Sequence, residues 1–214
     1  MADELPGVLV VLSGPSGVGK TTIAARLLQK PGYVRSISVT TRGMRNGEVE
    51  GGDYHFVPRE RFEELCQRGD LIEHAHVHGN YYGTPKEPLR RALAQCKVVL
   101  LVIDVEGGLQ VKMQDLDALL IFMLPPDQAE LVRRLEGRGT EDMKQQTVRL
   151  RRAEMETHRA RETYDHLVIN DDLERCVKEV DANIQAARRR LRQRLQSGQK
   201  LYAGLNPVSG PKEK

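Results

Sequence analysis

The sequence predicts an α/β fold in which helices cover both faces of a five-stranded parallel sheet. Apolar runs alternate with helical patterns along most of the 214 residues, which is typical of successive βαβ units. The first apolar run ends in a glycine-rich stretch, and an amphipathic pattern follows it directly. A stretch rich in glycine and aromatic residues separates the second and third runs and indicates an inserted lobe. A chain of this length favours one domain with an insertion over two independent domains.

The core elements are expected in chain order. Strands are predicted over residues 8–13, 36–40, 98–104, 119–124 and 166–169. The first helix is predicted over residues 21–30, because apolar side chains recur there at helical spacing, at Ile23, Ala24, Leu27 and Leu28. From residue 127 onward the pattern is helical and densely charged, with a break at 137–139 and a long helix that ends near residue 196.

The inserted lobe has a pattern of its own. Residues 48–57 contain paired glycines and aromatic residues, and we expect short antiparallel strands there. Residues 59–67 have a helical pattern, whereas residues 71–77 and 80–83 look extended. The insertion is therefore predicted to be a small mixed α/β lobe.

Composition and charge set mild limits on function. The formal net charge of +3 gives no bulk electrostatic argument for nucleic-acid binding. Cys66, Cys96 and Cys176 are scattered and odd in number, which suits a reducing cytosol. No stretch approaches the ~20 apolar residues of a spanning helix, and residues 8–12 are too few for a signal peptide. We therefore expect a soluble, cytoplasmic protein with no membrane or nucleic-acid partner.

The glycine-rich stretch has the spacing of a P-loop. A strand that turns into a helix through glycines directs backbone N–H groups and the positive end of the helix dipole at one point, where phosphate binds. Lys20 can reach the outer phosphates, and the Thr21 hydroxyl can bind Mg²⁺. The alternative is a glycine-rich turn with an incidental lysine. The predicted ATP cradle consists of Gly14, Pro15, Ser16, Gly17, Val18, Gly19, Lys20 and Thr21.

Several further motifs resemble the guanylate kinase family. They lie at residues 38–57, 71–75, 79–84, 135–140 and 168–172, and the resemblance extends from residue 8 to about residue 190. It implies a P-loop NTPase fold with a GMP-binding lobe and a helical lid. It also implies transfer of the γ-phosphoryl group of ATP to GMP, giving ADP and GDP, in purine nucleotide salvage and GMP recycling.

The resemblance also implies how the chain is divided. A single domain is expected over residues 1–205, followed by a flexible tail over 206–214. Within the domain, the GMP-binding lobe is expected at 40–84 and the lid at 138–152. The core is expected to comprise residues 1–39, 85–137 and 153–196.

Four residues of the insertion are candidates for holding the phosphate of GMP. Arg42 and Arg45 lie just past a predicted strand, and Tyr54 and Tyr82 lie nearby in the insertion. Two guanidinium groups and two phenol hydroxyls make a good receptor for a phosphate monoester. The alternative for the two arginines is a solvated loop, but the family resemblance implies that all four residues hold the phosphate.

Glu73 is the candidate for recognising the guanine base. A carboxylate accepts two adjacent hydrogen bonds, and guanine offers adjacent donors at N1 and the 2-amino group, whereas adenine does not. The alternative is an ordinary surface carboxylate on an alternating strand. The resemblance adds Ser38 and Thr84 as base contacts, and Thr84 stands where many relatives carry serine.

Asp104 closes the apolar run at 98–103, at the end of a predicted strand where ligands of α/β sheets collect. We expect it to hold Mg²⁺ together with Thr21, or to meet the acceptor nucleotide. The alternative is a cap at the strand end. Relatives commonly carry a second acid where this chain has Val102, and Glu106 replaces a frequent glutamine, so only Asp104 is assigned to the metal.

The lid is expected to supply catalytic arginines. Phosphoryl transfer needs mainly positioning and charge stabilisation, so Arg138 and Arg149 join Lys20 and Arg42 as predicted catalytic residues. The neighbours Arg133, Arg134, Arg151 and Arg152 are expected on solvated helix faces. Asn170 matches a family position near the adenine of ATP, although a turn residue would fit equally well.

Other basic and histidine-rich stretches are given no function. His74, His76 and His78 share one strand face, but we do not expect a metal there. The basic run at 188–194 is predicted to be a solvated part of the last helix, so that truncation after Ala187 would leave activity nearly intact. Two other functions stay open, a phosphopeptide-binding scaffold module and a kinase for a phosphorylated sugar. The protein is expected to be a monomer or homodimer.

Overall fold

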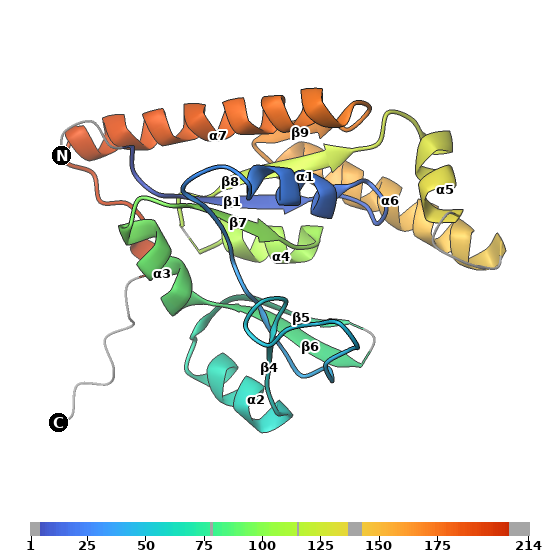
Figure 1. Ribbon diagram of the computed structural model, residues 1–214, viewed down its shortest axis with the longest axis horizontal. Helices are drawn as coiled ribbons and strands as arrows, with labels where there is room; N and C mark the ends of the chain where they lie inside the picture. The colour runs from blue at the N-terminus through green and yellow to red at the C-terminus, as the bar shows by residue number, and fades with distance from the viewer. Residues whose placement is uncertain (1–4, 78, 115, 137–142, 206–214) are drawn as a thin grey trace.

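The computed structural model describes residues 5–77, 79–114, 116–136 and 143–205 and contains two sheets (Figure 1). The larger sheet has five strands in the order β2-β7-β1-β8-β9, and every neighbouring pair is parallel. Its strands are β1 (Val8–Ser13), β2 (Tyr33–Arg35), β7 (Val98–Val102), β8 (Leu119–Leu124) and β9 (His166–Ile169). The predicted five-stranded parallel sheet is therefore confirmed.

Every residue of β1 is buried because helices cover both faces of this sheet. Val8, Val10 and Leu12 pack with α1 (Lys20–Leu27) and α7 (Leu173–Gln196) on one face. Leu9 and Val11 pack on the other face with α3 (Lys86–Ala94), α4 (Val105–Lys112) and residues at the end of α6 (Met143–Thr163). Successive side chains of a strand point to opposite faces, so a continuous apolar run fits a strand between two helical layers.

The second strand differs from the prediction. The core strand is β2, and the backbone leaves the sheet after Ser36, whose N–H donates to the Leu100 carbonyl over 2.9 Å. The next strand, β3 (Val39–Thr40), belongs to the smaller sheet, where it pairs antiparallel with β6 (Asn80–Pro85). The expected core strand over residues 36–40 is wrong, because a short apolar run does not reveal which sheet receives it.

The smaller sheet, in the order β4-β3-β6-β5, forms the inserted lobe together with α2 (Arg59–Gln67). The predicted helix and the extended stretches at β5 (Leu71–Val77) and β6 are confirmed. The antiparallel strands expected over 48–57 are wrong. Only β4 (His55–Phe56) is a strand there, and it pairs parallel with β3. The preceding residues are held in turns, in which Gly47 and Gly51 have φ values of 86° and 71°.

The C-terminal part consists of α5 (Gln128–Glu136), α6, β9, α7 and a short 3-10 helix, Ala203–Leu205. The helical prediction from residue 127 is confirmed for the described residues, and α7 ends at residue 196 as expected. The predicted break at 137–139 lies outside the described residues. Two arginines of the basic run have partners within the protein, and Arg188 is half-buried. Arg188 donates to the carbonyls of Leu5, Pro6 and Cys96 at 2.7, 2.8 and 3.0 Å, and Arg194 forms an ion pair with Asp117.

Among the described helices, none has the length and apolarity that crossing a membrane requires. The predicted tail at 206–214 lies outside the described residues.

Candidate active site

The P-loop prediction agrees with the local geometry between β1 and α1. Gly14, Gly17 and Gly19 have φ values of 147°, 83° and 98°, a region that residues with a side chain rarely adopt. A Cβ on Gly14 would lie 2.5 Å from the Met123 carbonyl, and one on Gly19 would lie 2.4 Å from Nδ2 of Asn170. These two positions therefore have no room for any residue larger than glycine.

Lys20 lies at the first position of α1, and its side chain folds back over the loop. Its Nζ donates to the carbonyls of Gly14 at 2.5 Å and Pro15 at 3.0 Å. Thr21 follows in the first helical turn and is exposed. The loop thus presents an ammonium group and a hydroxyl at the N-terminal end of a helix, where the dipole favours an anion.

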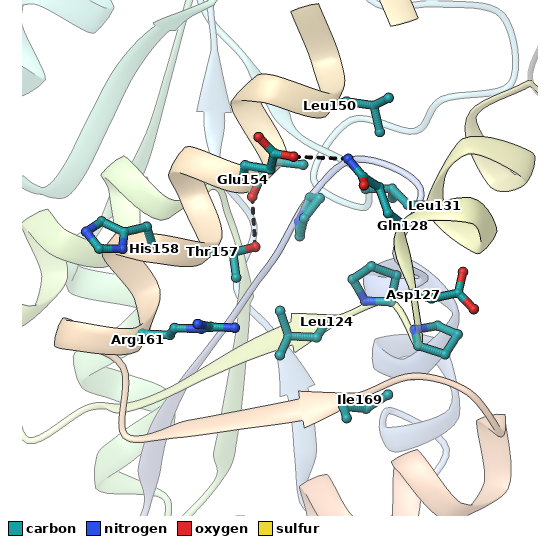
Figure 2. A pocket seen from close by; sticks show the side chains of 14 residues that line it. Leu124, Asp127, Gln128, Leu131, Leu150, Glu154, Thr157, His158, Arg161 and Ile169 are labelled. Carbon is teal, nitrogen blue, oxygen red and sulfur yellow. Dashed lines mark hydrogen bonds between the residues drawn. The ribbon is translucent and has the colours of Figure 1, made fainter. Parts of the chain in front are cut away.

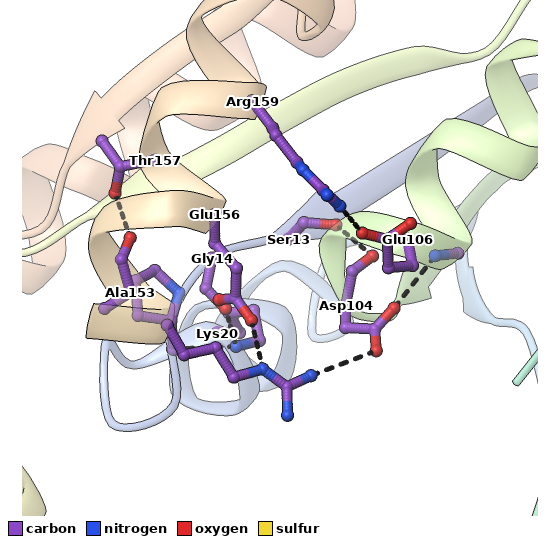
Figure 3. A network of polar contacts seen from close by, with 12 residues as sticks. Ser13, Gly14, Lys20, Asp104, Glu106, Ala153, Glu156, Thr157 and Arg159 are labelled. Atoms are coloured by element: carbon purple, nitrogen blue, oxygen red, sulfur yellow. Dashed lines mark hydrogen bonds and ion pairs between the residues drawn. The ribbon is translucent and has the colours of Figure 1, made fainter. Parts of the chain in front are cut away.

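A network of charges lies beside the lysine (Figure 3). Asp104 caps the N-terminus of α4, because its Oδ1 accepts from the Gly107 N–H at 2.9 Å. Arg152 of α6 bridges two carboxylates, with nitrogens 3.9 Å from Oδ2 of Asp104 and 2.9 Å from Oε1 of Glu156. Burial raises the pKa of Glu156, against the opposing influence of Arg152 and Lys20. Arg152 is exposed, as predicted for a solvated helix face, whereas no role was predicted for Glu156.

The three residues predicted to contact guanine lie together in the lobe. Glu73 on β5 is 5% exposed, and its Oε1 accepts from the Thr84 hydroxyl at 2.5 Å. The hydroxyls of Ser38 and Thr84 are 3.3 Å apart. Glu73 and Thr84 face each other because they are register partners of β5 and β6. The surface carboxylate that the sequence left open for Glu73 is therefore excluded.

The environment of Glu73 is strongly desolvating. Burial raises its pKa from 4.5 to about 7, the Thr84 hydrogen bond lowers it, and the charge of Asp104 raises it. A Cβ on Gly107 of α4 would lie 3.1 Å from Oε2 of Glu73. The core helix α4 therefore closes over the carboxylate of the lobe, and Asp104 at the start of that helix acts on its charge.

The predicted phosphate receptor is also assembled for the most part. The guanidinium carbon of Arg42 lies 5.5 Å from the centre of the Tyr54 ring. The rings of Tyr54 and Tyr82 are in edge contact, with centres 5.9 Å apart, and Tyr82 also interacts with Arg42. Arg45 lies on the adjoining exposed turn. The solvated-loop alternative does not hold for Arg42, whose side chain is 12% exposed.

Asn170 joins the P-loop from the end of β9. It is 7% exposed, and its Nδ2 donates to the Val18 carbonyl at 2.7 Å. Arg134 of α5 donates to the Asn170 carbonyl at 3.1 Å and the Val18 carbonyl at 3.4 Å. The solvated face expected for Arg134 is therefore wrong. Sequence spacing could not reveal this contact, because residues 18 and 134 are 116 positions apart.

A pocket of about 500 Å³ lies beside the loop, between α5, α6 and the ends of β8 and β9 (Figure 2). Gln128 of α5 and Glu154 of α6 are joined by a hydrogen bond of 3.0 Å at this pocket. Of the predicted site residues that the structure describes, Pro15 alone lines it. The pocket thus lies between α5 and α6, and the first half of α6 belongs to the expected lid.

Two predicted catalytic arginines are not placed by the structure. Arg138 lies outside the described residues, and Arg149 lies on α6, where its side chain is not described. No group of three or more His, Cys, Asp or Glu side chains that could hold a metal occurs in the described part of the chain. His78 is outside that part.

The fold and the site together define a class of protein, a P-loop phosphotransferase with a nucleotide-binding lobe. Comparison with known proteins identifies the family within this class. The sequence profile described as "Guanylate kinase" matches residues 7–187. A guanylate kinase of Anaeromyxobacter dehalogenans is 47% identical over 88% of this chain and 84% of its own length. One of Thermus thermophilus is 46% identical over 86% and 83%.

A solved structure agrees with these sequences. The crystal structure of guanylate kinase from Anaplasma phagocytophilum superposes with a TM-score of 0.69 at 38% identity, covering 86% of this chain and 88% of the other. The chain belongs to the guanylate kinase family.

Proposed function

We propose that this chain is a guanylate kinase that transfers the γ-phosphoryl group of ATP to GMP. The observation that carries the proposal is the buried carboxylate of Glu73, which faces Thr84 and Ser38 in the lobe. A buried carboxylate gains most from a ligand that offers two adjacent N–H donors, and guanine does so. Adenine or a sugar leaves that carboxylate without these donors, so it would be rejected.

The phosphates of the two substrates have separate receptors. The N–H groups of the glycine loop and Lys20 are proposed to hold the phosphates of ATP. Arg42, Arg45, Tyr54 and Tyr82 are proposed to hold the phosphate of GMP. Nζ of Lys20 donates to the carbonyls of Gly14 and Pro15, and incoming phosphate oxygens would be stronger partners for its charge.

The reaction needs little covalent help from the protein. Charge that develops on the transferred group is stabilised by fixed cations in a site that excludes water. Lys20 is proposed to act there, with Arg42 and with Arg138 and Arg149 of the lid. Asn170 and Arg134 keep the loop in shape from the side of β9 and α5.

Mg²⁺ is proposed as the cofactor, and the oxygens present fit it. The Thr21 hydroxyl and the Asp104 carboxylate are hard oxygen ligands, and Mg²⁺ usually needs only one or two such groups besides phosphates and waters. Oδ1 of Asp104 is used in capping α4, which leaves Oδ2 facing Arg152 at 3.9 Å. When bound, Mg²⁺ would neutralise charge on the phosphates of ATP. We also propose that the protein is located in the cytoplasm and acts in purine nucleotide salvage.

The test is a coupled assay of ADP formation with four acceptors, GMP, AMP, dTMP and ribose 1,5-bisphosphate. We expect rapid turnover with GMP alone. Glu73→Gln should weaken the use of GMP far more than that of ATP, because the amide places a donor against the donors of guanine. Turnover of the sugar phosphate, or no turnover with any acceptor, would overturn the proposal in favour of a sugar kinase or a binding module.

A further inference from the structure

We propose that Glu48 is a positioning residue for this reaction, which holds the guanidinium of Arg42 ready for the phosphate of the acceptor nucleotide. The inference rests on the proposed function. Glu48 binds Arg42 through both carboxylate oxygens, with Nη1 3.0 Å from Oε2 and Nη2 2.7 Å from Oε1. Two parallel bonds fix the plane of a guanidinium as well as its position.

The same carboxylate closes the turn that carries Arg45. The Arg45 N–H donates to Oε2 of Glu48 at 2.8 Å, and the Glu48 N–H donates back to the Arg45 carbonyl at 3.1 Å. Gly47, with a φ of 86°, allows the chain to turn this tightly. Glu48 therefore contacts both arginines of the predicted phosphate receptor. It binds the side chain of Arg42 and the backbone of Arg45.

The bonds of Glu48 leave one edge of Arg42 for another ligand. Arg42 donates three hydrogen bonds to Glu48 and the Gly43 carbonyl. These bonds use both N–H groups of Nη1 and one N–H group of Nη2. The remaining donors, on Nε and Nη2, lie on one edge of the planar group. Tyr82 interacts with Arg42, and the rings of Tyr54 and Phe56 lie 5.5 and 5.7 Å from the guanidinium carbon. A phosphate beside Tyr82 and Tyr54 would meet that edge.

The pair is charged over the working pH range. The hydrogen bonds from Arg42, and then that from the Arg45 N–H, lower the pKa of Glu48 to about 2. The side chains of Arg42 and Glu48 are only 12% and 20% exposed, so the pair is shielded from most solvent. A long arginine side chain that is already fixed loses less conformational entropy when the ligand binds.

The opposite role is physically possible, because a carboxylate beside an arginine could compete with phosphate. The two roles predict opposite effects of neutralising Glu48. If Glu48 positions Arg42, Glu48→Gln should raise the KM for GMP by about tenfold or more, with the KM for ATP within about twofold of the original. If Glu48 competes with phosphate, the KM for GMP should fall, and the proposal would be overturned.

Glu50→Gln is the matched control. Glu50 lies in the same lobe and, like Glu48, binds one backbone group and one side chain. Its carboxylate accepts from the Phe56 N–H at 2.9 Å and contacts the His55 ring at 3.0 Å. Its described contacts do not include Arg42. We expect its KM for GMP to stay within about twofold of the original. An equal rise in both variants would mean general damage to the lobe and would contradict a specific role for Glu48.

A double-mutant cycle tests whether Glu48 acts through Arg42. In a background of Arg42→Ala, Glu48→Gln should change the KM for GMP by less than about twofold, because the guanidinium to be positioned is gone and the amide oxygen of Gln can still accept from the Arg45 N–H. A full additive effect would overturn the proposal. If Glu48→Gln does not fold, Glu48→Asp keeps the charge but shortens the side chain, so the KM for GMP should still rise. An unchanged KM for GMP in that variant would also overturn it.

Failure of this inference is distinguishable from failure of the proposed function. The unmodified protein is measured with GMP and ATP in the same assay, and its turnover reports the function by itself. An active parent with an unaffected Glu48→Gln variant refutes only the positioning role.

Discussion

At the scale of single residues, the charged form of Glu73 is unfavourable in the folded protein. It is 5% exposed, and burial raises its pKa to about 7 although Thr84 donates a hydrogen bond to it. Each pKa unit corresponds to about 1.4 kcal/mol. An ionised Glu73 therefore costs the folded protein stability, which binding of guanine donors would offset.

We expect Glu73→Gln to be more stable than the parent at pH 8. The pKa of Glu73 is raised in the folded state, so the stability from its protonated form is complete below pH 4.5 and is lost as the pH rises through about 7. The amide never ionises, so the variant should gain up to about 3 kcal/mol at pH 8 and much less at pH 5. Urea denaturation at both pH values measures this, and a variant less stable than the parent at pH 8 would contradict it.

The P-loop holds the ammonium group of Lys20 in place when no phosphate is bound. It donates to two loop carbonyls, at 2.5 and 3.0 Å, and lies close enough to Glu156 to oppose the rise in pKa of that acid. Removing the ammonium should therefore affect the charge balance of the site more than the packing of the core.

We expect Lys20→Ala to fold and to lose nearly all phosphoryl transfer. The lysine meets charge on the outer phosphates, which water cannot replace in a closed site. ADP formation with saturating GMP measures the activity, and thermal unfolding reports the fold. Turnover and unfolding temperature both unchanged would refute the assignment of the P-loop.

At the scale of elements, α7 is the element whose role changes most once its contacts are known. Its apolar stripe includes Ile184, Ala187 and Leu191, which are buried against the sheet. Arg188 donates hydrogen bonds to three carbonyls, two in the N-terminal segment and one in the turn before β7. Tyr202 and Leu205, beyond the helix, are also part of the packing. Truncation after Ala187 should therefore destabilise the protein, contrary to the expectation from the sequence.

Arg188→Ala should lower the free energy of unfolding by about 2 kcal/mol, because three carbonyls lose a charged donor. Arg189→Ala is the matched control, since Arg189 is the next residue on the same helix and is exposed. We expect that variant to stay within about 0.5 kcal/mol of the parent. Chemical denaturation compares the two, and equal losses would show that Arg188 has no special role.

At the scale of the whole molecule, the core and the lobe meet at the predicted reaction centre. The helix α4 belongs to the core, and it contacts β5 of the lobe next to Glu73. The helix α6 touches the same centre from the other side through Arg152 and Glu156. Asp104 at the start of α4 therefore links the three parts, because its charge acts on Glu73 of β5 and its Oδ2 lies 3.9 Å from Arg152 of α6.

We expect the lobe at 40–84 and the predicted lid at 138–152 to move towards the P-loop when both nucleotides bind. Closure would exclude water, which otherwise hydrolyses ATP. Hydrogen exchange with GMP and a non-hydrolysable ATP analogue should show new protection in both segments, and small-angle scattering should show compaction. No change in either measurement would contradict closure.

Much of the fold and of the candidate site could be predicted from the sequence, where the signal is local. The P-loop depends on contiguous residues, because a strand, glycines with positive φ and a helix must follow one another. The grouping of Ser38, Glu73 and Thr84 was predicted from resemblance, and the register of β5 and β6 supports it. Membership of the guanylate kinase family likewise followed from motifs in their order.

Only the tertiary structure decided which residues meet across long separations. Periodicity marked an apolar run near residue 39 but could not say that it joins the smaller sheet. Composition marked Arg134 and Arg188 as basic residues on helices, but their partners lie 116 and 183 positions away. Local patterns report exposure and periodicity, whereas the partner of a long side chain depends on how distant elements pack. For that reason the sequence determined the kind of site, and the packing of distant elements determined which charges complete it.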